Sequence, residues 1–69
     1  MKNNVIQGVK YLRKSRNLSQ AMLGRAIGVS RSKISSWELG RRELSVKDAV
    51  KVANFFQVSL DDLVDPAGL

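Results

Sequence analysis

Two short helical patterns lie close together in the first half of the chain, and each begins at a serine and ends at a glycine. The first follows Ser19 and ends at Gly28, and the second follows Ser30 and ends at Gly40. Serine caps the free N–H groups at a helix start, and glycine readily adopts the left-handed conformation that terminates many helices. The spacing therefore predicts a short helix over residues 20–27 and another that starts at residue 31, with a tight turn between them.

The second pattern, SRSKISSW, is rich in serine but contains two large apolar residues. Ile34 and Trp37 are three residues apart, so they fall on one side of a helix and form its buried side. The opposite side carries Ser32, Ser35, Ser36 and Leu39, with Arg31 and Lys33 on the flanks. Short polar side chains let a helix backbone approach another surface closely, which favours a helix that lies in a groove.

Similar signals predict three further helices. Asn4 and Gln7 can form a capping box for a first helix from Val5 to Ser15 or Arg16, on which Val5, Val9 and Leu12 share one face. Ser45 with Asp48 predicts a fourth helix, and Ser59 starts a short fifth. The apolar face of the fourth helix is traced by Val46, Ala49, Val50, Ala53 and Phe56.

The absence of any strand pattern predicts an all-α fold, a compact bundle of five helices. Because the chain has 69 residues, without repeats or an internal linker, we expect a single domain over residues 1–69. Its core is expected over residues 5–64, with a frayed tail at residues 65–69.

Positive and negative charges are segregated along the chain. Residues 1–37 contain eight Lys or Arg and no acid, whereas residues 43–69 contain two Lys and five acids. A fold that gathers the basic part on one face attracts a polyanion, and nucleic acid is the commonest such partner of a small basic domain.

Composition also argues against other functions. The chain has neither cysteine nor histidine, which excludes thiolate nucleophiles and the usual zinc sites and leaves no side chain that titrates near neutral pH. We therefore expect no catalysis, no cofactor, no metal and no small-molecule ligand. The N-terminus lacks the apolar run of a signal peptide, and no segment approaches the ~18 apolar residues of a membrane span, so we expect a cytoplasmic protein without membrane association.

The segment LSQAMLGRAIGVSRSKISSWELG resembles the helix-turn-helix of the phage repressor and Cro type, the Xre-like regulators. The resemblance extends from about Val5 to Val64, and LRKSRNLSQ, WELGRRE and VSLDDLV are also similar to segments of the family. It implies a lambda-repressor-like fold. Gly24 stands where the family usually has alanine, and we expect that a side chain larger than alanine there would separate the second and third helices.

The resemblance further implies that the helix starting at Arg31 is the recognition helix that enters the major groove of DNA. The positions that match the base-facing ones are Arg31, Ser32 and Ser36, with Lys33 and Ser35 able to reach bases or phosphates at the edges. The expected phosphate contacts are Gln20, Ser30, Arg41 and Arg42. Leu39 replaces a residue that is commonly polar, so it either touches a thymine methyl group or covers Trp37.

Two contacts within the protein are also expected. The family commonly pairs the positions of Arg13 and Glu38 in a structural salt bridge between the first and third helices. Phe55 lies about 160° around the fourth helix from Ala53, so it points outward unless another element covers it. We expect a two-fold interface formed by Leu60 to Val64, with Leu69 and Phe55 beside it, or else a fifth helix that folds over Phe55 within one monomer.

These features predict a sequence-specific regulator of transcription that binds double-stranded DNA, specifically a repressor that binds a palindromic operator as a homodimer. A protein-interaction or antitoxin-like module on the same fold is the alternative, because fold does not fix function. A disordered kinase-substrate peptide around RSKISS is a weaker alternative, because the helix that buries Ile34 would have to unfold.

Overall fold

The computed structural model describes residues 4–64, with side chains from Gly8 to Leu63, and these residues form five helices and no strand. The helices are α1 (Asn4–Ser15), α2 (Gln20–Ile27), α3 (Arg31–Glu38), α4 (Val46–Phe56) and α5 (Leu60–Val64). This order confirms the predicted all-α, five-helix fold. None of the helices within the described residues is long and apolar enough to cross a membrane.

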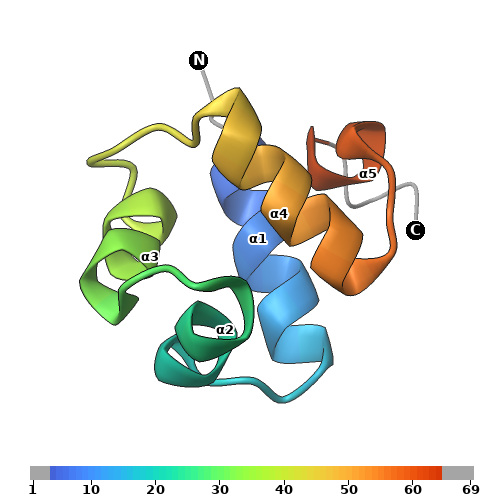
Figure 1. The fold of residues 1–69 in the computed structure, drawn as a ribbon. Helices are drawn as coiled ribbons and strands as arrows, with labels where there is room; N and C mark the ends of the chain where they lie inside the picture. Colours follow the sequence, from blue (N-terminus) through green and yellow to red (C-terminus); the bar gives the residue numbers. More distant parts are fainter. Residues whose placement is uncertain (1–3, 65–69) are drawn as a thin grey trace.

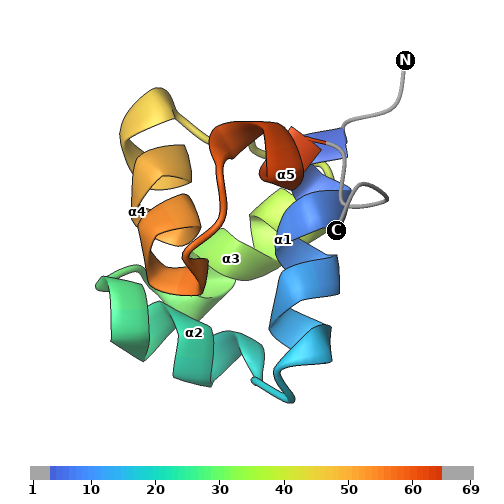
Figure 2. The same cartoon turned by 90° about the vertical axis from the view of Figure 1, so that its right-hand side faces the viewer.

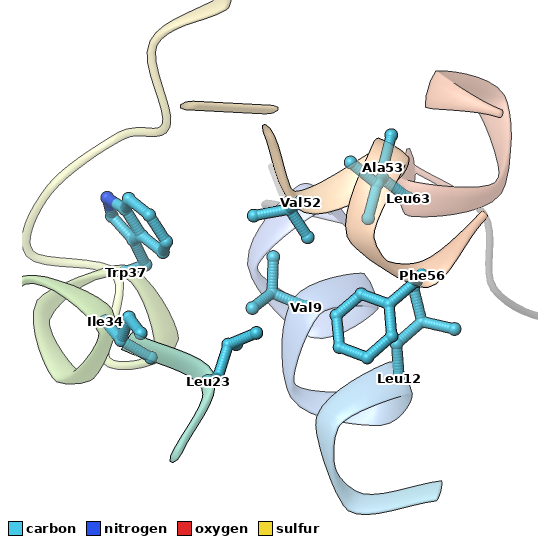
Figure 3. Close-up of a cluster of buried hydrophobic side chains, with 9 residues drawn as sticks. All are labelled: Val9, Leu12, Leu23, Ile34, Trp37, Val52, Ala53, Phe56 and Leu63. Atoms are coloured by element: carbon cyan, nitrogen blue, oxygen red, sulfur yellow. The ribbon is translucent and has the colours of Figure 1, made fainter. Parts of the chain in front are cut away.

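The helices surround one core to which all five contribute. Figure 1 shows α1 and α4 in the middle of the molecule, with α3 on one side and α5 on the other, and Figure 2 shows α2 at the end where α1 finishes. The buried apolar side chains, most of them fully inaccessible, are Val9, Leu12, Leu23, Ile34, Trp37, Val52, Ala53, Phe56 and Leu63 (Figure 3). The serine-rich α3 therefore belongs to the core through Ile34 and Trp37, as its sequence predicts.

Local capping signals set most of the helix boundaries. Ser19 and Ser45 accept hydrogen bonds from the backbone N–H groups of Met22 and Asp48, at 3.0 and 3.1 Å. Ser59 accepts one from Asp62 N–H at 3.2 Å and donates its own N–H to the Asp62 carboxylate. The starts of α2, α4 and α5 therefore agree with the predicted ones.

Two details differ from the sequence-based prediction. α1 begins at Asn4, so Asn4 is a helical residue and does not act as the predicted N-cap. The side chains of Asn4, Val5, Gln7 and Val64, and the whole tail at residues 65–69, lie outside the described part of the chain.

The buried face of α4 is rotated relative to the predicted one. Val46 and Val50 are 78% and 39% exposed, whereas Val52, which the prediction omitted, is fully buried. Because α4 is contacted by α2 as well as by α5, its buried face is centred between Val52 and Ala53, and Val46 and Val50 lie at its edge.

α5 approaches α1 more closely than any sequence pattern indicated. A Cβ atom added at Gly8 of α1 would overlap the backbone carbonyl of Leu63 in α5. Glycine is therefore required there for steric reasons, and this close approach lets a five-residue helix bury Leu63 in the core.

Candidate nucleic-acid interface

The candidate surface is built on α2, α3 and the turn between them. Gly28 ends α2 with φ 73° and ψ 36°, a left-handed conformation that glycine adopts without strain. Two residues later, Ser30 accepts a hydrogen bond from Lys33 N–H at 3.2 Å and starts α3. This short turn fixes α3 relative to α2, as expected for the paired capping signals.

Gly24 allows the close contact between α2 and the turn. A Cβ atom at this position would overlap the Val29 carbonyl and would lie 3.4 Å from Cδ1 of Ile34. The sequence-based prediction was that residues larger than alanine are excluded. The structure is stricter, because alanine itself would already overlap the backbone.

The outward side of α3 is uncovered. Arg31 and Ser32 are exposed, Ser35 and Ser36 are half-buried, and the two spine residues are inaccessible. Among the described residues, no side-chain hydrogen bond or ion pair involves Arg31, Ser32, Ser35 or Ser36. One guanidinium and three hydroxyl groups are thus available on this side to bind a ligand.

Leu39 extends the same side of α3 at its C-terminal end. It is 63% exposed even though Trp37 is fully buried, so Leu39 is not needed to cover the indole ring. Of the two roles expected for Leu39, contact with an external apolar group therefore fits the structure better.

Lys33 has a partner within the protein. Its ammonium group lies 3.1 Å from Oδ2 of Asp48, the third residue of α4, and the Asp48 residue is only 7% exposed. The sequence placed Lys33 at the edge of the reading surface and read Asp48 only as part of a helix cap. Neither helical periodicity nor capping patterns contain a signal for this pair.

The C-terminal end of α3 is tied to α1. Arg13 donates from Nε to Glu38 Oε2 at 2.7 Å and from Nη2 to Glu38 Oε1 at 2.9 Å, so the pair is bidentate. Its third nitrogen, Nη1, donates to the Leu18 carbonyl at 2.8 Å. The two side chains that the family resemblance pairs are therefore in direct contact, and both are largely buried.

Gln20, an expected phosphate contact, joins the same network. Its amide nitrogen donates to Glu38 Oε1 at 3.0 Å, which leaves its amide oxygen and one N–H without a partner among the described residues. Sequence analysis missed this contact, because Gln20 and Glu38 are 18 residues apart and lie on different helices.

This network shifts the pKa values of both charged partners. Burial by itself would raise the pKa of Glu38, but the hydrogen bonds from Arg13 and Gln20 and the charges of Arg13 and Lys10 outweigh it, so the pKa is lower than usual. The hydrogen bond to Glu38 raises the pKa of Arg13 although burial opposes the shift. Both groups therefore remain ionised at neutral pH.

The loop after α3 carries the other two expected phosphate ligands. Arg41 and Arg42 are exposed, and their backbone N–H groups donate to the Ser36 carbonyl at 2.9 and 3.3 Å. Gly40, with φ 77°, makes the turn that allows these bonds. Two guanidinium groups are thus held next to the end of α3.

The surfaces expected to form a dimer lie elsewhere. Leu60, at the start of α5, is 45% exposed, and Phe55 is 41% exposed with its ring edge-on to Phe56 at 5.0 Å. The fifth helix therefore leaves Phe55 accessible in the monomer. The side chain of Val64 and the residue Leu69, the other expected members, lie outside the described residues.

Comparison with known proteins agrees with this geometry. The helix-turn-helix family matches residues 9–63. An uncharacterized HTH-type transcriptional regulator of Methanocaldococcus jannaschii, MJ0272, is 41% identical over 63 residues, which cover 91% of this chain and 89% of that protein. The crystal structure of the restriction-modification controller protein C.AhdI from Aeromonas hydrophila superposes with a TM-score of 0.80 at 28% identity and covers 88% of this chain and 92% of its own.

The same fold also occurs within a longer enzyme chain. Hydroxypropylphosphonic acid epoxidase from S. wedmorenis superposes with a TM-score of 0.81 over 96% of this chain but only 35% of its own, at 24% identity. This likeness concerns the fold alone.

Proposed function

This chain belongs to the helix-turn-helix family of DNA-binding transcriptional regulators, and on that basis we propose that it is a repressor that binds a palindromic operator as a homodimer. The observation that carries the proposal is the uncovered side of α3, where Arg31, Ser32 and Ser36 have no partner among the described residues. Repression requires only that the operator be occupied, since a bound dimer blocks the overlapping promoter. Such a protein would act in the cytoplasm, where the DNA is.

In this proposal α3 lies in the major groove and its side chains read bases. Arg31 is the main reader, because a guanidinium group pairs in a bidentate manner with O6 and N7 of guanine. Ser32 and Ser36 are short, so their hydroxyl groups hydrogen-bond to bases only when the helix backbone is close to the groove floor. Ser35 serves the edge of the same surface.

Phosphate contacts would hold α3 in register on the duplex. Gln20 retains one N–H for a phosphate, and the free N–H groups at the start of α2 add a positive dipole end. The Ser30 hydroxyl accepts from Lys33 N–H, and its own proton remains free to be donated. Arg41 and Arg42 supply charge beyond the other end of α3.

The dimer would form through the α5 side of the molecule. Leu60 is the proposed centre, with Phe55 and Val64 as further members, because exposed large apolar side chains are the usual anchors of interfaces. α5 lies on the opposite side of α1 and α4 from α3, so this interface leaves both reading helices uncovered (Figure 1).

Two binding assays test the assignment of roles on DNA. Against an operator selected from random duplexes, Arg31→Ala should cost ~1–3 kcal/mol per half-site and relax the preference at one base pair. Arg41→Ala should weaken all sequences alike and lower the salt slope by about one per half-site. Lys14→Ala on the exposed side of α1 is the control and should change neither quantity.

Sedimentation at micromolar concentration tests the interface. The wild-type chain should be a dimer, Leu60→Asp a monomer, and Met22→Ser unchanged, since Met22 is equally exposed, at 46%, but lies on α2. Phe55→Ser shows whether Phe55 belongs to the interface. A folded wild-type chain that binds no duplex would instead favour a protein-interaction or antitoxin-like role.

A further inference from the structure

One cation beside the reading surface is held by an acid of another helix. The Lys33 ammonium lies 3.1 Å from Oδ2 of Asp48, with 34% of the Lys33 side chain and 10% of the Asp48 side chain exposed. Within residues 4–64, this pair and the Arg13–Glu38 pair are the ion pairs of the molecule. Lys33 is thus the one cation of α3 that is neutralised in place.

The Asp48 carboxylate faces α3 and is not used by its own helix. Asp48 is the third residue of α4, and its backbone N–H donates to the capping hydroxyl of Ser45. The reverse bond of a capping box, from Ser45 N–H to the carboxylate, is absent among the described residues, whereas α5 makes both bonds through Ser59 and Asp62. The carboxylate therefore has Lys33 as its partner.

Resting on the proposed function, we propose that Asp48 is a positioning residue for specificity, because it keeps Lys33 out of the set of DNA contacts. Lys33 follows Ser32 by about 100° around α3, so a released ammonium group on its four-carbon stem would reach the phosphates that border the groove. A lysine–phosphate contact stabilises every sequence equally and carries no base information. Removing one such contact leaves a larger share of the binding energy to Arg31 and the serines.

DNA does not simply take Lys33 away from Asp48. Its departure would leave a largely buried carboxylate without a counter-charge, whereas a single exposed phosphate contact is screened by salt and water. The intramolecular pair is therefore the more stable arrangement in the complex as well.

The test compares salt slopes of binding to the selected operator and to random duplex DNA between 50 and 200 mM salt. Asp48→Asn keeps the shape of the side chain and releases Lys33, so the slope should steepen by about 0.9 per half-site, an extra loss of about 3.5-fold over this range. The ratio of specific to random binding should fall. Asp61→Asn changes the net charge equally on exposed α5 and should leave the slope unchanged.

A double variant, Asp48→Asn with Lys33→Gln, replaces the ion pair by two amides and keeps the test valid if the single variant unfolds. Its slope should equal that of the wild type, since Lys33 makes no phosphate contact there. A slope lower by about 0.9 per half-site would show that Lys33 already contacts DNA and would overturn the inference. An unchanged slope in folded Asp48→Asn would overturn it too, with the proposed function intact, whereas a wild-type chain that binds no duplex would refute both.

Discussion

Glu38→Gln removes one charge from the network that holds α3 on α1. The Glu38 carboxylate accepts three hydrogen bonds, two from Arg13 and one from Gln20, between 2.7 and 3.0 Å. Glutamine preserves the size of the side chain but offers one acceptor oxygen, and its NH₂ group would face another donor. Arg13, whose side chain is 11% exposed, would be left without its counter-charge.

The magnitude follows from burial. Removing one partner of a buried ion pair costs ~3–5 kcal/mol, because the remaining charge is desolvated and unpaired. We expect about 3 kcal/mol, the lower end, because Arg13 keeps its bond to the Leu18 carbonyl. At about 0.05–0.15 kcal/mol per residue, a domain of this size has a total stability of roughly 3–10 kcal/mol, so this loss is a large part of it.

Urea and thermal unfolding measure this loss. Trp37 is the only tryptophan and is fully buried, so its fluorescence reports the packing of α3 while circular dichroism reports the helices. The melting temperature should fall by roughly 12 °C or more. Glu43→Gln removes the same charge from an exposed loop position and should stay within about 0.5 kcal/mol of the wild type.

A double variant separates the charge effect from packing. Replacing Arg13 and Glu38 together by methionine removes both charges, so most of the lost stability should return. If Glu38→Gln is as stable as Glu43→Gln, the pair does not hold α3, and the reasoning from burial and distance is wrong.

Three further outcomes follow from the structure and are measured by the same unfolding assays. Gly24→Ala should destabilise the domain by ~1–3 kcal/mol, because its Cβ overlaps the Val29 carbonyl, despite the ~1 kcal/mol that alanine normally gains over glycine within a helix. Gly8→Ala should destabilise it by a similar amount, because its Cβ overlaps the Leu63 carbonyl and displaces α5; equal or higher stability would show that the helices can separate freely. Because the pKa of Glu38 is lowered by folding, its stabilisation is complete above the unfolded value of about 4.3 and is lost as pH falls through the lower folded value, a loss that an acid titration of Glu38→Gln should lack.

Local signals in the sequence predicted much of the fold. The bounds of α2 follow from Ser19 and Gly28, and the start of α3 from Ser30, because caps and left-handed glycines act within one helical turn. Apolar spacing placed Ile34 and Trp37 in the core for the same reason. Such predictions need no knowledge of where the other helices lie.

The partners of the polar side chains required the assembled fold. Gln20 and Lys33 were assigned to DNA, yet in the free domain each contacts an acid of another helix. Helical periodicity gives the side of a helix on which a residue lies, but not which neighbour faces that side or at what distance. The rotation of α4 that buries Val52 in place of Val50 has the same origin, since contacts from α2 and α5 together set the buried face.

The two ion pairs together explain how so polar a helix is held in one orientation. α3 buries only Ile34 and Trp37, and two side chains on one line leave the helix free to roll about that line. At about 100° per residue, Glu38 and Lys33 lie on opposite flanks of the line, and they are near opposite ends of the helix. The bond of Glu38 to α1 resists rolling in one direction, and the bond of Lys33 to α4 resists it in the other. Because hydroxyl groups as short as those of Ser32 and Ser36 tolerate little displacement from their hydrogen-bond partners, this restraint is what allows a serine-rich surface to discriminate between bases.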